Sequence, residues 1–419
     1  MSQFPYPIQY FSCRDFEASP EKIQRMLEYL SQLGTGLAGP VAGETGIPGL
    51  KIDFNDGIRL QVPAGNWQVT IGDHDSGMVF YDGDASETIL ISFEKYYVRW
   101  QVEIRRDGVL VFSHIFDPAG QKVRLVFNSV LLGDTLSFFP YLPRVREAFG
   151  AADVYYSIDR KMQALCQRLF PDIRQRDYAE ADTYATYYFN SGIDFPGAMP
   201  INGRILPIAH AGQMILNLPS PAPKLPWVPG PRQIKEPYVC LGAQASHVAK
   251  GWLWPGGWEA VVAHLKGLGY RVLGIDREKE CRAAFKGQNY TVKMPDGAED
   301  FTGNRPLLER ADMLHHADFF IGLPSGLSWL AWTADCPVVM IGGFSLFWHE
   351  FPTPYRVYNR LACDGCYNSL KDIWQGDGCP RQKPGTEAVL QCSKTITPRM
   401  VIAAIDRLLA DKRTGREPL

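Results

Sequence analysis

A proline-rich segment in the middle of the chain restricts the possible folds, because regular secondary structure cannot run through it. In this 419-residue sequence, prolines occupy positions 219, 221, 223, 226, 229, 231 and 237 of the segment 218–237. Proline has a fixed φ and no backbone N–H to donate, so neither a helix nor the interior of a sheet can run through such a segment. We predict a stiff, extended linker that joins two separately built halves.

The two halves share one rhythm, in which short apolar runs alternate with helical patterns. Before the linker, strands are expected at 123–127, 154–157 and 185–189, and helices at 136–149 and 162–170. After the linker, strands are expected at 238–241, 271–275, 319–322 and 337–341, and helices at 258–268, 307–315, 325–333 and 400–409. This alternation predicts two Rossmann-like α/β domains with parallel sheets, and a ligand cleft between their carboxyl edges.

Residues 56–116 follow the two-residue period of antiparallel strands instead. Ile58, Leu60 and Val62 alternate with Arg59 and Gln61, and the same pattern returns around residues 67–71 and 98–105. Asp107-Gly108 is a hairpin-turn signal. These features predict a small antiparallel sheet or barrel with one buried face, which serves as a scaffold or binds a partner.

The N-terminal region holds a helical pattern at 23–30 and a formal G-x-G-x-x-G at residues 34–39. We reject the glycine motif as a dinucleotide site. It follows a helix instead of a strand, and Pro40 comes where the motif would have to open a helix.

Composition excludes several kinds of partner. Lys and Arg total 43 against 45 Asp and Glu, a net charge of −2, and no basic run forms a surface for nucleic acid. The sequence shows neither a signal peptide nor an apolar stretch of the roughly 20 residues that a membrane helix needs. We therefore expect a cytoplasmic protein whose nine cysteines are reduced.

A carboxylate follows the first strand of the first α/β half. Gly133 allows close backbone approach, and Asp134 lies where the next helix begins, facing the expected cleft. A carboxylate there can accept a proton from a hydroxyl group. Asp is also a preferred helix N-cap, and spacing alone favours that structural alternative.

Two loops of the second half have the features of anion-binding turns. After the strand at 238–241 come Gln244, Ser246 and Lys250, in which backbone N–H groups and a lysine could hold a departing diphosphate. After the strand at 319–322 come Ser325, Gly326 and Leu327, whose hydroxyl and amides would face the same anion. A surface lysine and an ordinary capped turn are the structural alternatives. Two such turns in one domain fit a pyrophosphate better than one does.

Four cysteines lie close together near the C-terminus. Cys363, Cys366, Cys379 and Cys392 are spaced C-x2-C-x12-C-x12-C, whereas the other five are scattered singly. Four thiolates within a short segment favour a structural metal site over four unrelated thiols, and tetrahedral sulfur suits zinc or iron equally. We expect a role in structure or assembly, because the cluster lies beyond the last strand.

These motifs resemble those of a known enzyme family. Gly133-Asp134-Thr-Leu-Ser-Phe-Phe-Pro140-Tyr-Leu142 is similar to the G-D-x-L-x-x-x-P-x-L signature of bacterial heptosyltransferases, and Lys250-x-x-x-Trp254-Pro255 to their K-x-W-P segment, with two more residues before Trp-Pro. The turn at 322–326 resembles their phosphate turn, with Leu323-Pro324 in place of the usual aspartate. The β-rich start and the cysteine segment match the autotransporter heptosyltransferases over nearly the whole chain.

The resemblance implies a fold, a reaction and roles for residues. It implies a GT-B glycosyltransferase that uses ADP-heptose to modify serines of an autotransporter adhesin passenger. Asp134 would be the general base, Lys250 would hold the pyrophosphate, and Ser325 and Gly326 would contact the donor phosphates. A single in-line displacement would invert the anomeric carbon, and the charge of Lys250 would make a catalytic divalent metal unnecessary. The four cysteines would bind one iron per subunit, with zinc as the alternative, in a ring-like dodecamer.

The expected division of the chain follows from the motifs and the resemblance together. It comprises an N-terminal segment with a small antiparallel β domain (1–118), an acceptor-side Rossmann-like domain (119–217), the linker (218–237), a nucleotide-sugar Rossmann-like domain (238–362), the four-cysteine finger (363–392) and a C-terminal helix (393–419). Two alternatives remain open. One is a lipopolysaccharide or other nucleotide-sugar glycosyltransferase, and the other is a non-enzymatic module that binds a partner through its metal finger.

Overall fold

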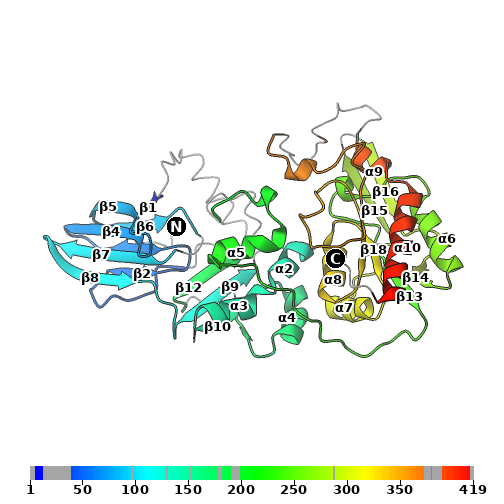
Figure 1. Cartoon of the computed structure of the whole chain (residues 1–419). Coiled ribbons are helices and arrows are strands. Elements are labelled where there is room, and N and C mark those ends of the chain that lie inside the picture. The colour runs from blue at the N-terminus through cyan, green and yellow to red at the C-terminus, as the bar shows by residue number, and fades with distance from the viewer. Residues whose placement is uncertain are drawn as a thin grey trace.

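The computed structural model describes residues 5–12, 39–95, 98–127, 131–150, 152–177, 182–189, 199–285, 288–371, 379 and 389–415. The helical pattern at 23–30 and residues 34–38 of the glycine motif lie outside these ranges. Three sheet-containing regions follow one another along the long axis of the molecule (Figure 1). No helix in the described part of the chain is long and apolar enough to cross a membrane.

The N-terminal region contains two four-stranded sheets. One has the order β5-β4-β7-β8 and is antiparallel throughout: β5 (Val79–Ala85), β4 (Trp67–Asp73), β7 (Trp100–Arg106) and β8 (Val109–Ile115). The other has the order β1-β6-β3-β2: β1 (Ile8–Phe11), β6 (Thr88–Ser92), β3 (Arg59–Val62) and β2 (Lys51–Asp53). Asp107 and Gly108 turn β7 into β8 with φ values of 51° and 79°, as the hairpin signal predicts. In the second of these sheets β1 lies parallel to β6.

The prediction of a single buried face is wrong for β3. All four of its residues are buried, including Arg59. The guanidinium donates to both carboxylate oxygens of Asp53, with Nε–Oδ1 and Nη2–Oδ2 distances of 2.7 and 2.6 Å. Alternation of polar and apolar residues does not separate an exposed arginine from one buried with its counter-ion.

The β region is joined to the next sheet by backbone hydrogen bonds. Phe54, just after β2, pairs in parallel with Ala185 of β12. Its N–H donates to Tyr184 O and its carbonyl accepts from Thr186 N–H, both at 3.0 Å. This isolated bridge links the N-terminal β region to β12, the edge strand of the first α/β sheet.

The first α/β sheet is parallel, in the order β11-β10-β9-β12. Its strands are β9 (Lys122–Phe127), β10 (Asp153–Ser157), β11 (Arg174–Gln175) and β12 (Ala185–Phe189), and the helices are α2 (Leu132–Phe138), α3 (Tyr141–Ala148), α4 (Gln163–Leu169) and α5 (Ala211–Leu216). The single helix expected at 136–149 is therefore two helices. Pro140, which has no N–H for a continuous helix, becomes the N-cap of α3.

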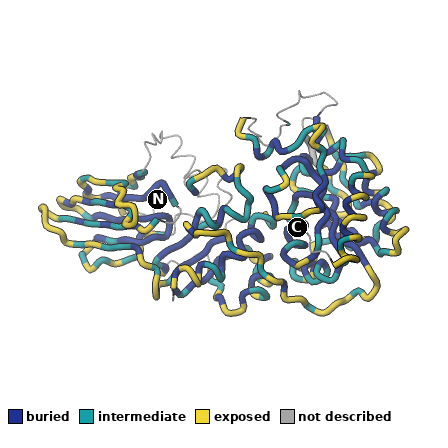
Figure 2. Tube along the Cα trace, in the orientation of Figure 1, coloured by how far each residue is buried: buried dark blue, intermediate teal, exposed yellow. Residues whose placement is uncertain are grey.

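The linker 218–237 contains no helix or strand and is mostly exposed, as Figure 2 shows along its course. It is held to the second sheet region at a few points. Asp312 accepts hydrogen bonds from Gly230 N–H at 2.8 Å and from Trp227 Nε1–H at 3.3 Å, and Arg168 of α4 approaches the same carboxylate at 3.4 Å. These contacts tie the two α/β regions to one carboxylate.

The second α/β sheet is also parallel, in the order β17-β14-β13-β18-β19-β20. Its strands are β13 (Tyr238–Leu241), β14 (Arg271–Gly274), β17 (Glu299–Asp300), β18 (Phe320–Gly322), β19 (Val338–Ile341) and β20 (Arg356–Val357). The helices are α6 (Gly257–Gly267), α7 (Leu307–His315), α8 (Gly326–Thr333), α9 (Gln391–Lys394) and α10 (Pro398–Thr414). Leu268, expected on the buried face of α6, is 49% exposed because it caps the helix C-terminus.

The alternating pattern did not predict a hairpin, β15 (Glu280–Phe285) with β16 (Gln288–Lys293), which is inserted between β14 and β17. It also missed the two-residue edge strands β11, β17 and β20. Such short strands contain too few residues to show a period.

Candidate active site

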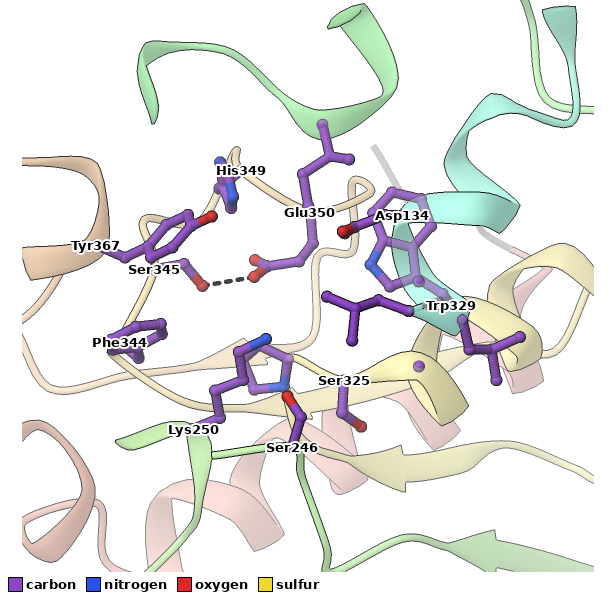
Figure 3. A pocket seen from close by; sticks show the side chains of 16 residues that line it. Asp134, Ser246, Lys250, Ser325, Trp329, Phe344, Ser345, His349, Glu350 and Tyr367 are labelled. Atoms are coloured by element: carbon purple, nitrogen blue, oxygen red, sulfur yellow. Dashed lines mark hydrogen bonds between the residues drawn. The ribbon is translucent and has the colours of Figure 1, made fainter. Parts of the chain in front are cut away.

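A cavity of about 280 Å³ lies where the carboxyl ends of the two parallel sheets face each other (Figure 3). The first domain contributes the start of α2, and Ile208 comes from a short 3-10 turn. The second contributes the loops after β13, β18 and β19, and Tyr367 comes from the cysteine segment. This is the position in which open α/β sheets bind ligands.

Two glycines let the helices on the opposite sides of the cavity meet. A Cβ on Gly133 of α2 would lie 2.6 Å from the Trp329 ring of α8, and one on Gly326 would lie 2.8 Å from the Leu132 Cβ. Real Cβ atoms do not approach so closely, so any larger residue would push the two helices apart. Gly133, predicted for close approach, and Gly326, predicted only as an amide donor, together set the width of the site.

Asp134 lies in the first turn of α2, is half-buried and borders the cavity. The helix begins at Leu132 with Leu131 as its N-cap, and that cap makes no side-chain hydrogen bond. The structural alternative, in which Asp134 is the N-cap, is therefore wrong. A carboxylate in the first helical turn is also favourably placed relative to the helix dipole.

The other side of the cavity holds the cation and the hydroxyls that the sequence predicts. Lys250 ends the 3-10 turn Val248–Lys250, and Ser246 lies four residues before it. Ser325 and Gly326, at the start of α8, complete this wall. The structure thus brings Asp134, Ser246, Lys250, Ser325 and Gly326 into one cavity.

Two predicted residues lie in an adjoining cavity instead. Gln244 and Leu327 line a second space of about 370 Å³, which shares Leu132, Ser246, Ser325 and Gly326 with the first. The Gln244 side chain donates through Nε2 to Glu278 O at 2.7 Å. The two cavities therefore adjoin along the second domain.

A buried carboxylate shapes the loop between these cavities. Asp276, just beyond β14, accepts hydrogen bonds from the backbone N–H groups of Ala243 at 2.8 Å and Gln244 at 3.2 Å. Burial raises its pKa to about 6, although these N–H groups and Arg310 oppose the shift. Asp276 therefore holds the anion-binding loop in place from behind.

Sequence reasoning missed the loop after β19 as a source of polar site residues, apart from noting that His349 could border the cleft. Ser345, His349 and Glu350 all line the cavity, and each is more than nine-tenths buried. Glu350 accepts from Ser345 Oγ at 2.5 Å and from Arg356 Nη1 at 2.5 Å. The only signal in the sequence was a Trp-His-Glu run after a strand, whereas its partner Arg356 lies on an edge strand too short to predict.

Burial lowers the pKa of His349, which is therefore held neutral. Its Nδ1 lies 3.1 Å from both Leu206 O and the amide nitrogen of Asn368. Asn368 also accepts from Leu346 N–H at 2.8 Å and donates to Arg204 O at 2.6 Å. The first part of the cysteine segment is thereby fixed against the wall of the cavity.

The four clustered cysteines lie near one another. Burial, followed by the thiols of Cys366, Cys363 and Cys379, raises the pKa of Cys392 well above its ordinary value. None of the cysteines in the described part of the chain is in a disulfide. Among those residues no group of three or more His, Cys, Asp or Glu side chains is arranged to hold a metal ion. The donor set suits a metal, and the metal site itself stays a prediction.

Family models match two parts of the chain. Residues 46–108 match the N-terminal domain of the glycosyltransferase TibC, and residues 216–357 match glycosyltransferase family 9, the heptosyltransferases. Together with the two parallel sheets and the cavity between them, these matches define the chain as a glycosyltransferase.

Three relatives indicate which kind of glycosyltransferase the chain resembles. The chain is 38% identical to the autotransporter heptosyltransferase BAHTCr of Citrobacter rodentium, over 85% of this chain and 88% of the relative. It is 36% identical to the autotransporter heptosyltransferase TibC of Escherichia coli O78:H11, over 87% and 91%. It is 30% identical to the inactive autotransporter heptosyltransferase BimC of Burkholderia thailandensis, over 84% of each.

A crystal structure of TibC, a dodecameric, iron-containing heptosyltransferase in complex with ADP-D-β-D-heptose, superposes with a TM-score of 0.81 at 35% identity. The alignment covers 88% of this chain and 98% of TibC. The chain belongs to the autotransporter heptosyltransferase family.

Proposed function

We propose that this enzyme transfers heptose from ADP-heptose to serine hydroxyls of an autotransporter adhesin passenger, in the cytoplasm. One observation carries the proposal. A single cavity brings Asp134 of α2 together with Lys250, Ser246, Ser325 and Gly326 of the second domain. A proton acceptor thus faces a set of anion-binding groups, as transfer from a sugar diphosphate to a hydroxyl requires.

In the proposed reaction Asp134 is the general base. It takes the proton of the acceptor hydroxyl as that oxygen forms a bond to the anomeric carbon of the donor. The bond from this carbon to the diphosphate oxygen breaks in the same step, so one displacement inverts the anomeric centre. No covalent enzyme intermediate is needed.

In the proposed reaction the second domain stabilises ADP as the leaving group. Lys250 neutralises charge on the leaving diphosphate, and the backbone amides of Gly326 and Leu327 together with the Ser325 hydroxyl hold its oxygens. Gln244 and Leu327, in the adjoining cavity, would contact the rest of the nucleotide. With a lysine in this position the proposed mechanism uses no catalytic divalent metal.

The proposed division of the chain follows these roles. A small β domain (1–118) precedes an acceptor-side Rossmann-like domain (119–217), the linker (218–237) joins it to a nucleotide-sugar Rossmann-like domain (238–362), and the finger (363–392) and C-terminal helix (393–419) follow. This is the GT-B arrangement. The pairing of Phe54 with Ala185 of β12 supports a β domain that is attached to the acceptor-side domain.

We also propose that Cys363, Cys366, Cys379 and Cys392 bind one iron per subunit, with zinc as the alternative, in a dodecamer. Two observations support this. Cys366, Cys363 and Cys379 add to burial in raising the pKa of Cys392, and the similar TibC is described as dodecameric and iron-containing. The metal would order the segment between the cysteines, and it takes no part in the transfer step.

A second function, that of a non-enzymatic family member, is favoured by one observation: the relative BimC is described as inactive. Co-expression with a candidate adhesin tests both. We expect the intact mass of the adhesin to rise by whole multiples of a heptosyl residue. An adhesin of unmodified mass, with nucleotide binding retained by this chain, would favour the non-enzymatic function. A mass increase that corresponds to another sugar would leave a glycosyltransferase with a different donor.

A further inference from the structure

The two cavity walls leave one acidic group without a role in the transfer. Among the described residues that line the cavity, Asp134 and Glu350 are the carboxylates. Asp134 is assigned to the acceptor proton. The turn 323–325, which faces the same space, is Leu-Pro-Ser and carries no carboxylate. Building on the proposed function, we propose that Glu350 recognises the sugar of the donor by accepting hydrogen bonds from its hydroxyl groups.

The geometry of Glu350 suits a fixed acceptor. Ser345 Oγ donates to its Oε1 and Arg356 Nη1 to its Oε2, both at 2.5 Å. Arg356 in turn donates through Nη2 to Ser345 O at 3.0 Å. An ionised carboxylate offers about four acceptor positions, so one protein donor on each oxygen leaves capacity for a ligand.

The charge of Glu350 is maintained despite its burial. The side chain is 6% exposed, and burial alone would raise its pKa, yet the charge of Arg356 and the hydrogen bonds from Ser345 and Arg356 lower it. Glu350 therefore enters the site as an anion that accepts hydrogen bonds and donates none. Hydrogen bonds to such charged groups are roughly twice as strong as neutral ones.

The sign of this charge indicates which part of the donor lies beside Glu350. A carboxylate repels a diphosphate, and the anion-binding groups Ser246, Lys250 and Ser325 lie on the other side of the cavity (Figure 3). Sugar hydroxyls are neutral donors and pair well with a carboxylate. The diphosphate then lies along the Lys250 wall and the sugar between Glu350 and Asp134, which places the anomeric carbon within reach of the base.

The test compares two ligands that differ only by the sugar. Dissociation constants of ADP and ADP-heptose are measured by calorimetry on the full-length wild-type protein and on Glu350→Gln. We expect ADP to bind within about twofold of wild type and ADP-heptose to bind about tenfold or more weaker, the loss that corresponds to one charge-assisted hydrogen bond. Asp134→Asn is the matched control, because it also removes one carboxylate of the cavity and should leave both constants nearly unchanged.

Glu350→Gln also leaves Arg356 without its counter-ion, and an unpaired buried charge could unfold the protein. The double variant Glu350→Gln/Arg356→Met removes both charges and should show the same selective loss. Equal weakening of both ligands, in whichever variant folds, would mean that the ion pair only supports the loop. Unchanged binding of ADP-heptose, with or without a loss of turnover, would overturn the proposal as well. Wild-type protein that binds ADP-heptose no better than ADP-glucose would instead contradict the proposed function.

Discussion

The two walls of the cavity are built differently. The first domain contributes a short helix with one ionisable group, Asp134, whereas the second contributes three loops with a cation, hydroxyls and backbone amides. The first wall is positioned mainly by packing, since Gly133 meets Trp329 at a distance that leaves no room for a Cβ. The second is positioned by buried polar groups, with Asp276 behind one loop and Arg356, which is paired with Glu350, behind another.

The difference separates two tasks. Proton transfer needs one carboxylate at a defined distance from the acceptor, and close helix packing provides this. Binding and releasing a diphosphate needs several donors around a long, charged ligand, which loops at the ends of strands supply. If this division is correct, substitutions in the two walls will affect different kinetic constants.

The largest effect is expected for Asp134→Asn. Loss of a general base costs about 10² to 10⁴ in rate, while the amide keeps the size of the side chain. Turnover should fall by that factor, and the dissociation constant of ADP-heptose should stay within a few-fold of wild type, as measured by steady-state kinetics and calorimetry. Activity within a few-fold of wild type would remove Asp134 from the chemistry.

Lys250→Ala should impair both binding and turnover. Its charge faces the diphosphate before and during the reaction, and removal of one such electrostatic group costs about 10² to 10³ in rate. Ser325→Ala is the matched control from the same wall. It should change either constant only a few-fold, because the neighbouring amides remain. Normal kinetics for Lys250→Ala with every donor would show that the lysine is a surface residue. The assignment of diphosphate binding to the second wall would then be wrong.

The cysteine segment extends the second wall, because Tyr367 lines the cavity and Asn368 contacts His349. Cys363→Ser or Cys379→Ser should lose the bound metal and disturb assembly before chemistry, since such sites determine the folding of their segment. Elemental analysis and light scattering measure the two effects. Wild-type protein that contains neither iron nor zinc, with all four thiols freely titratable, would refute the metal site.

The smallest effect concerns Asp276 and the stability of the second wall. Its pKa is raised from 3.8 to about 6 in the folded protein, so its contribution to stability is present below pH 3.8 and lost as the pH rises through 6. Relative to Asp276→Asn, wild type should lose about 2 kcal/mol of unfolding free energy between pH 4 and pH 7. Urea unfolding at several pH values measures this difference. A difference that does not change with pH would show that burial does not perturb the carboxyl.

Much of this architecture could be predicted from local pattern. The linker, the alternating strands and helices on both sides of it and the Asp107-Gly108 hairpin are all found in the structure, because prolines, apolar runs and turn residues act locally. Helix α7 was expected at the residues it occupies. The break before α3 was missed because apolar periodicity continues through Pro140.

The site was less completely predictable. Asp134, Lys250 and the turn at Ser325 all lie beyond the carboxyl ends of parallel strands, where open α/β folds bind ligands. Glu350 and Arg59 could not be assigned, since each depends on an arginine or aspartate whose proximity only the folded chain reveals. A charged residue can be buried when its counter-ion is beside it in the fold, and a single sequence does not show which residues become such neighbours.

Choice of donor tests the central claim most directly. The anion-binding wall would accept any nucleotide diphosphate, so selection of heptose must come from groups that bind the sugar. A site that hydrogen-bonds an additional hydroxyl discriminates by roughly 10⁴ or more, whereas one that senses only size manages about 10 to 200. The measurement is a competition of ADP-heptose against ADP-glucose and UDP-glucose for one acceptor. We predict transfer of heptose almost exclusively, and equal rates with ADP-glucose would contradict the heptosyltransferase assignment.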